Sequence, residues 1–85
     1  MVGAYSASKA AVVALVKTVA LENRDRGISA NTVLPGTMDT PANRGSGDAS
    51  KFVQPSQVAA VLIHLVSDEG SQITGAAIPV YGSQL

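Results

Sequence analysis

Apolar residues follow a helical pattern over the first third of the chain, from residue 5 to about residue 26. This stretch is rich in Ala, Leu, Val and Lys and contains no Gly or Pro before Gly27, so it predicts a helix that a glycine ends. One apolar stripe consists of Val12, Leu15, Val16 and Val19, and a second consists of Ala7, Ala10, Ala11, Ala14 and Leu21. A helix that is apolar on two sides needs cover on two sides. We expect a sheet on one side and a partner subunit on the other.

The remaining pattern predicts a strand, a loop, a second helix and a last strand. Residues 28–34 form a β-type run that Pro35 and Gly36 close. Residues 37–51 are polar and predict a loop, with one helical turn near residues 41–44. Residues 55–67 predict a helix whose apolar face is Val58, Ala59, Leu62, Leu65 and Val66. Residues 75–82 predict a short strand, in which Pro79 indicates an edge position or an irregularity because proline has no N–H to donate.

The order helix, strand, loop, helix, strand predicts an α/β fold with parallel strands joined by a right-handed crossover. Two short strands make a poor sheet by themselves. We therefore expect residues 1–85 to be the C-terminal part of a single doubly wound, Rossmann-like domain whose nucleotide-binding half lies outside this sequence.

Composition narrows the possible partners and the compartment. The 85 residues carry six basic and six acidic side chains, so no net field attracts nucleic acid or anionic lipid. There is no Cys, and His64 is the only His, which argues against disulfides and metal sites. No uninterrupted apolar run reaches the ~18 residues of a membrane span, and no secretory signal is visible. We expect a cytoplasmic protein that binds neither membranes nor nucleic acid.

Tyr5 and Lys9 are the first candidates for chemistry. They stand four residues apart at the start of the predicted helix, so their side chains lie on one face. A nearby ammonium stabilises a phenolate, which makes a phenol more useful for proton transfer to a carbonyl or alcohol oxygen. An Ala-rich helix can also place a Tyr and a Lys at this spacing by chance.

Tyr5 and Lys9 belong to the first of four sequence motifs that follow one another along the chain. Residues 3–11 (GAYSASKAA) resemble the active-site helix of the short-chain dehydrogenase/reductase family, and residues 31–40 (NTVLPGTMDT) resemble its next signature, a strand that ends in Pro-Gly and is followed by a Thr. The late helix and the final strand of that family are similar to residues 58–68 and 73–82. The resemblance covers nearly the whole chain.

This resemblance implies an oxidoreductase that moves a hydride between a nicotinamide and a carbonyl or alcohol substrate. Tyr5 matches the catalytic acid/base that exchanges a proton with the substrate oxygen. Lys9 matches the residue that assists the phenol and hydrogen-bonds the nicotinamide ribose. Members of the family are usually dimers or tetramers, so the resemblance implies a homodimer or homotetramer for the full-length protein.

The resemblance also implies a set of cofactor-binding residues after the first strand. Pro35 and Gly36 match the turn that approaches the nicotinamide, and Gly has no Cβ to keep a ligand away. Met38 matches the position whose backbone holds the carboxamide, and Thr40 matches a hydroxyl that contacts the cofactor. The residue that discriminates NAD from NADP follows the second strand of such domains, a strand that this sequence lacks, so NAD and NADP are equally expected.

Several family features have no counterpart here. The catalytic Ser, the relay Asn and the Gly-rich turn all belong upstream of Tyr5, and no G-x-G-x-x-G pattern occurs in this sequence. Residues 37–44 are also similar to the dihydropteridine reductase branch of the family.

Because the catalytic Ser, the relay Asn and the Gly-rich turn are missing from this sequence, the second hypothesis is a truncated, non-catalytic fragment. Such a fragment would act as an interaction or structural piece, with an exposed sheet edge.

Overall fold

The computed structural model describes residues 2–45 and 47–82. Two helices and two strands follow each other along the chain: α1 Val2–Asn23, β1 Thr32–Pro35, α2 Pro55–Val66 and β2 Ala77–Val80. Three short 3₁₀ turns, Arg24–Arg26, Ala49–Lys51 and Asp68–Gly70, lie between them. The strands are parallel and form a two-stranded sheet, with Thr32 opposite Ala77 and Pro35 opposite Val80. The α/β class with parallel strands is confirmed.

Helix α1 ends where the glycine signal predicts, through an intermediate turn. The regular helix stops at Asn23, whose side-chain amide donates to the Val19 carbonyl at 2.8 Å. A 3₁₀ turn carries the chain on to Gly27, which has a φ of 70°. Only glycine adopts this left-handed conformation without steric cost, so Gly27 ends the helix as predicted.

Helix α2 begins at Pro55, inside a capping box in which the Gln57 side chain accepts from the Gln54 backbone N–H at 2.8 Å. It ends one residue before the predicted limit, because Ser67 is already extended and its hydroxyl donates to the His64 carbonyl. In the preceding loop, the Arg44 N–H donates to the Thr40 carbonyl at 3.1 Å. This bond confirms the helical turn expected near residues 41–44.

The strands are shorter than the sequence predicts, and side-chain bonds together with backbone bonds join their amino ends. The Asn31 side chain donates to the Ile73 carbonyl at 3.0 Å and accepts from the Ala76 N–H at 3.0 Å. The Ala30 N–H donates to the Thr74 hydroxyl at 3.2 Å. The Gly75 N–H also donates to the Ala30 carbonyl at 2.8 Å, so these bonds hold the two segments together ahead of the regular pairing, which starts at Thr32.

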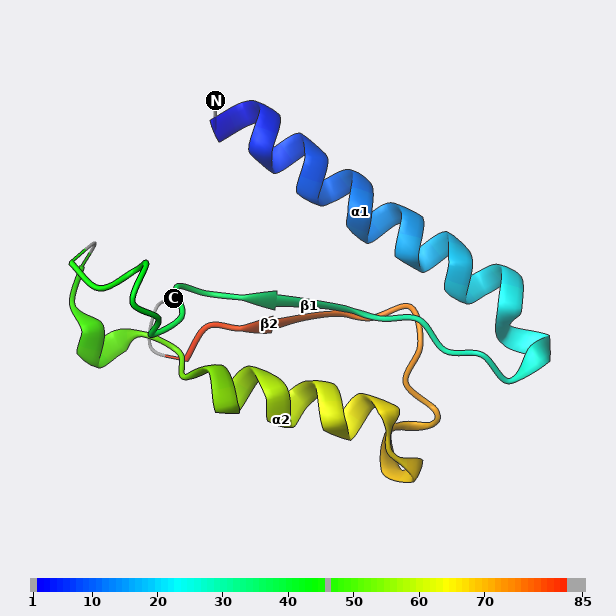
Figure 1. Ribbon diagram of the computed structural model, residues 1–85. Coiled ribbons are helices and arrows are strands. Elements are labelled where there is room, and N and C mark those ends of the chain that lie inside the picture. Colours follow the sequence, from blue (N-terminus) through cyan, green and yellow to red (C-terminus); the bar gives the residue numbers. More distant parts are fainter. Residues whose placement is uncertain (1, 46, 83–85) are drawn as a thin grey trace.

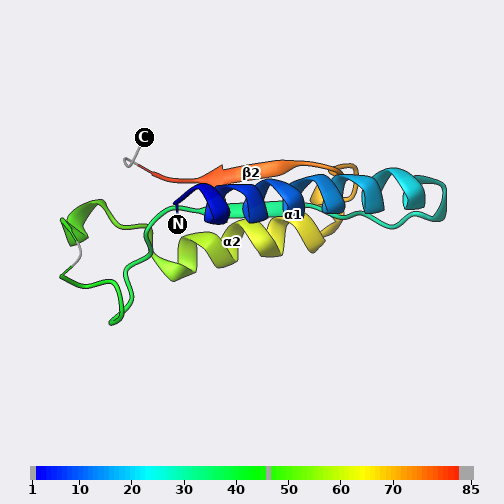
Figure 2. The same cartoon turned by 90° about the horizontal axis from the view of Figure 1, so that it is seen from above.

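The two helices lie on opposite faces of the sheet (Figure 1). The view from above shows α1 running along the sheet over β1 (Figure 2). Among the described residues, the buried apolar side chains are Ala20, Val53 and Leu65. Large side chains of α1 remain exposed, with Leu15 at 64% and Leu21 at 57%. Most of the cover that the two apolar stripes need is therefore not supplied by this chain.

Helix α1 also has the length and the apolar composition of a membrane-spanning helix, over Gly3–Arg26. The absence of such a segment, expected from the sequence, is thus not confirmed. A helix that a globular domain covers on two sides has the same length and composition. Lys9 and Lys17 lie within this stretch.

Candidate active site

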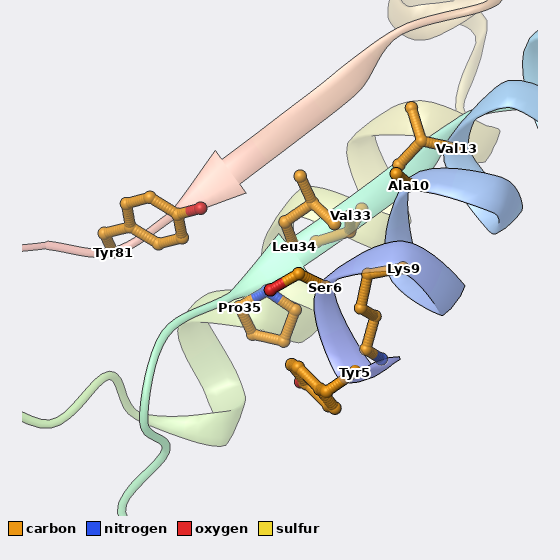
Figure 3. A pocket seen from close by; sticks show the side chains of 9 residues that line it. All are labelled: Tyr5, Ser6, Lys9, Ala10, Val13, Val33, Leu34, Pro35 and Tyr81. Carbon is orange, nitrogen blue, oxygen red and sulfur yellow. The ribbon is translucent and has the colours of Figure 1, made fainter. Parts of the chain in front are cut away.

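Tyr5 and Lys9 lie together on the first turns of α1. The Lys9 Nζ is 5.3 Å from the centroid of the Tyr5 ring, within the range of a cation–π contact. The Tyr5 side chain is 64% exposed and accessible to a ligand. Figure 3 shows the two side chains side by side at the end of α1 that faces Pro35. The expectation that both occupy one face of the helix is confirmed.

A hollow of about 480 Å³ lies between the start of α1 and the sheet (Figure 3). Helix α1 contributes its first turns, β1 contributes its carboxyl end, and the residue after β2 closes one side. The lining residues are Tyr5, Ser6, Lys9, Ala10, Val13, Val33, Leu34, Pro35 and Tyr81. The hollow therefore joins the proton-transfer candidates to the strand that carries the Pro-Gly turn.

A second hollow of about 510 Å³ adjoins the first at the carboxyl end of β1. The two hollows share Tyr5, Pro35 and Tyr81. The other lining residues of the second hollow are Gly36, Thr37, Met38 and Asn43. In open α/β sheets, ligands bind beyond the carboxyl ends of the strands, which is where both hollows lie.

Five of the six predicted site residues line these hollows: Tyr5, Lys9, Pro35, Gly36 and Met38. Thr40 lines neither of them. Its backbone N–H donates to the Met38 carbonyl at 2.9 Å, and its own carbonyl begins the helical turn that follows. The backbone of Thr40 thus supports the loop, and the contact of its hydroxyl with a cofactor stays a prediction.

Tyr81 and Asn43 are two of the lining residues that were not predicted as site residues from the sequence. Tyr81 follows Val80, which pairs with Pro35, so parallel pairing brings the ends of both strands to one edge. Figure 3 shows its hydroxyl directed toward the α1 side of the hollow. The topological rule for parallel sheets could have indicated Tyr81, whereas Asn43 depends on the fold of the loop.

The loop after β1 is fastened by a carboxylate. The Asp39 side chain accepts from Gln54 Nε2 at 3.1 Å and from Arg44 Nε at 3.1 Å. The hydrogen bond from Gln54, followed by that from Arg44, lowers the pKa of Asp39 from its ordinary value of 3.8. Since Gln54 caps α2, Asp39 links the loop to the start of that helix.

This carboxylate gives the loop an acid-sensitive link. A folded-state pKa below the unfolded value means that the contribution to stability is complete above pH 3.8 and is lost as the pH falls through the folded value. We expect the Asp39 carboxyl carbon to titrate with a midpoint below 3.8 in an NMR titration from about pH 5 to about pH 2.

The control for this titration is Asp39→Asn, which keeps an acceptor oxygen but removes the charge. In this variant, the free energy of unfolding should no longer depend on the titration of residue 39. It should still depend on the titration of Asp48, whose pKa is lowered by hydrogen bonds from Ser50. A midpoint at or above 3.8 for Asp39 would contradict the link.

Comparison with known proteins identifies the group to which this geometry belongs. The family described as "Enoyl-(Acyl carrier protein) reductase" matches residues 1–82. The chain is 40% identical to 3beta-hydroxysteroid dehydrogenase 1 of Eggerthella lenta, over 92% of this chain and 35% of that protein. It belongs to the short-chain dehydrogenase/reductase family.

Other members show the same relationship. The chain is 36% identical to the 3-oxoacyl-[acyl-carrier-protein] reductase FabG of Thermotoga maritima, over 92% of this chain and 36% of that protein. It superposes with a TM-score of 0.83 on a short-chain dehydrogenase/reductase of Serratia marcescens, solved as a mutant, at 28% identity and covering 94% of this chain and 37% of that one. The chain thus spans about a third of the length of these relatives.

The comparisons confirm the predicted family and the Rossmann-type α/β fold. Short-chain dehydrogenases/reductases generally use NAD(P) and act on small molecules. The superposition on the Serratia marcescens structure includes nearly the whole chain, so α1 occupies a place in that domain fold.

Proposed function

We propose that this chain is the C-terminal, proton-transferring part of an NAD(P)-dependent oxidoreductase domain that interconverts a small-molecule carbonyl and its alcohol. One observation supports the proposal above all others. Tyr5 and Lys9 lie in contact on α1 and line a hollow that is continuous with the Pro35-Gly36 turn of β1. The nucleotide-binding half of the domain belongs to the part of the relatives that this chain does not span.

The residues present fit a nicotinamide cofactor. The volumes of the two hollows fall within the ~300–1,000 Å³ typical of small-molecule sites. Lys9 offers an ammonium donor to a ribose hydroxyl, Pro35 and Gly36 allow close approach, and the Met38 backbone offers polar groups to a carboxamide. When bound, such a cofactor supplies or accepts the hydride.

Tyr5 is assigned the proton. In reduction, the phenol O–H bond breaks as the new O–H bond forms on the former carbonyl oxygen, which leaves the phenolate on Tyr5. In oxidation, the phenolate takes the alcohol proton. Lys9 holds a positive charge beside the ring from which the proton leaves, with its Nζ 5.3 Å from the ring centroid.

The second candidate function is a non-catalytic interaction or structural piece. It is favoured by the exposed apolar side chains of α1, which need cover from other protein. We assign that cover to the rest of the domain and to a second copy in a homodimer or homotetramer. We also assign the protein to the cytoplasm, with α1 as a packing helix of the domain and not a membrane span.

Binding of the nucleotide decides between the two functions. The protein is purified as the cell produces it and titrated with NADH and with NADPH by calorimetry. It is then mixed with a panel of small ketones and aldehydes, and oxidation of the nucleotide is followed by the absorbance of the nicotinamide. We expect saturable binding of at least one nucleotide in about the 1 μM–1 mM range usual for enzymes, and its oxidation by some carbonyl. Failure to bind either nucleotide would favour the interaction piece.

A further inference from the structure

The Met38 carbonyl is held by two donors. It accepts from the Thr40 N–H at 2.9 Å and from the Asn43 side-chain amide at 3.1 Å. A carbonyl oxygen has two lone pairs, so these two bonds use its ordinary capacity. Asn43 thus donates from its side chain to the backbone of Met38.

The peptide groups on both sides of Met38 are also fixed. The Val53 N–H donates to the Thr37 carbonyl at 2.9 Å, and the Asp39 N–H donates to the Val53 carbonyl at 2.8 Å. Val53 is 4% exposed, so the anchor itself is buried. Together with the bonds that Arg44 and Gln54 donate to the Asp39 carboxylate, this pairing ties the loop to the start of α2.

The Met38 N–H is a backbone donor in the part of the loop that lines the second hollow. In the part of the chain that the structure describes, it donates no hydrogen bond to the backbone, although the neighbouring amides of Asp39 and Thr40 are both paired. An unpaired N–H in the lining of a hollow is available to an acceptor on a ligand. The fixed carbonyl determines the orientation of the following peptide, and the Val53 pairing determines that of the preceding one.

We propose that Asn43 is a positioning residue, which holds the peptide after Met38 while Val53 holds the peptide that carries the Met38 N–H, so that the loop meets its ligand through an ordered backbone. This inference rests on the proposed function, because the ligand it concerns is the carboxamide end of a nicotinamide cofactor. Asn43 acts through Met38, and its effect is on binding. Pre-orientation lowers the conformational entropy lost when the ligand binds.

The test compares Asn43→Ala with Asn23→Ala, a matched control. Asn23 likewise donates from its side chain to a backbone carbonyl, that of Val19, but it lies at the far end of α1 (Figure 1). We expect Asn43→Ala to raise the KM for NADH or NADPH about tenfold, to change kcat at saturation less than twofold, and to leave the unfolding midpoint within the range of the control. Asn43→Gln, which keeps the amide donor, should recover part of the affinity.

Amide hydrogen exchange without nucleotide gives a second readout that does not depend on the proposed function. We expect faster exchange at Asp39 and Thr40 in Asn43→Ala, and wild-type exchange there in Asn23→Ala. Unchanged exchange would overturn the proposal, as would equal losses in kcat and in affinity or a marked drop in the unfolding midpoint. If the wild-type protein binds neither nucleotide, the proposed function fails, and the exchange measurement alone decides whether Asn43 orders the loop.

Discussion

Replacing Tyr5 by Phe is expected to lower kcat by about 10²–10⁴-fold, the usual contribution of a positioned acid/base. The substitution removes one oxygen and keeps the ring, so the contact of Lys9 with the ring and the shape of the hollow should persist. Nucleotide affinity should therefore change less than about threefold, because binding depends on the ring and on Lys9 rather than on the hydroxyl. Steady-state kinetics and a nucleotide titration on the same preparation measure both quantities.

Tyr81→Phe is the matched comparison for this experiment. Tyr81 lines both hollows with Tyr5 and loses the same atom, but it has no ammonium beside it in the described part of the structure. We expect its kcat to fall less than about tenfold, the effect of a lost hydrogen bond. Equal losses in the two variants, or a Tyr5→Phe variant with wild-type turnover, would remove Tyr5 from its role as acid/base.

Most of the fold could be predicted because its signals are local. Gly27 ends α1, Pro55 begins α2, and alternation of helix and strand is sufficient to predict parallel pairing. The strand limits could not be predicted, because the amino ends of both strands are held by the Asn31 side chain and the Thr74 hydroxyl. Those bonds join residues that are distant in the sequence, and their effect on strand length has no local pattern.

The residues of the candidate site also fall into two groups, those that local sequence predicts and those that only the tertiary fold brings to the site. The pair of Tyr5 and Lys9 follows from the spacing of a helix, and their contact is a local consequence. Tyr81 and Asn43 reach the hollows only through the pairing of the two strands and the folding of the loop. Thr40, whose hydroxyl the resemblance assigns to the cofactor, lines neither hollow, and its backbone N–H donates to the Met38 carbonyl; the role of its hydroxyl stays a prediction.

The largest expected effect on stability comes from Gly70→Ala. Gly70 is buried in the turn after α2, where an added Cβ would clash with the His64 carbonyl oxygen and would lie 3.0 Å from the Leu65 Cα. Both neighbours are backbone atoms at the end of a helix, which cannot rotate away as a side chain could. The turn must shift, and its bonds from Gly70 to Ser67 and from Ile73 to Gly70 shift with it.

We expect Gly70→Ala to lower the free energy of unfolding by about 3 kcal/mol, at the upper end of ordinary overpacking, as measured by urea denaturation. Gly3→Ala is the control, because it adds the same methyl group within α1 where nothing lies within 4 Å, and it should raise stability by about 0.5–1 kcal/mol. A Gly70→Ala variant as stable as the wild-type protein would show that the turn has room for a side chain. Since this turn lies at the opposite end of the sheet from Tyr5 (Figure 1), turnover per folded molecule should be unchanged, which separates loss of the fold from loss of the chemistry.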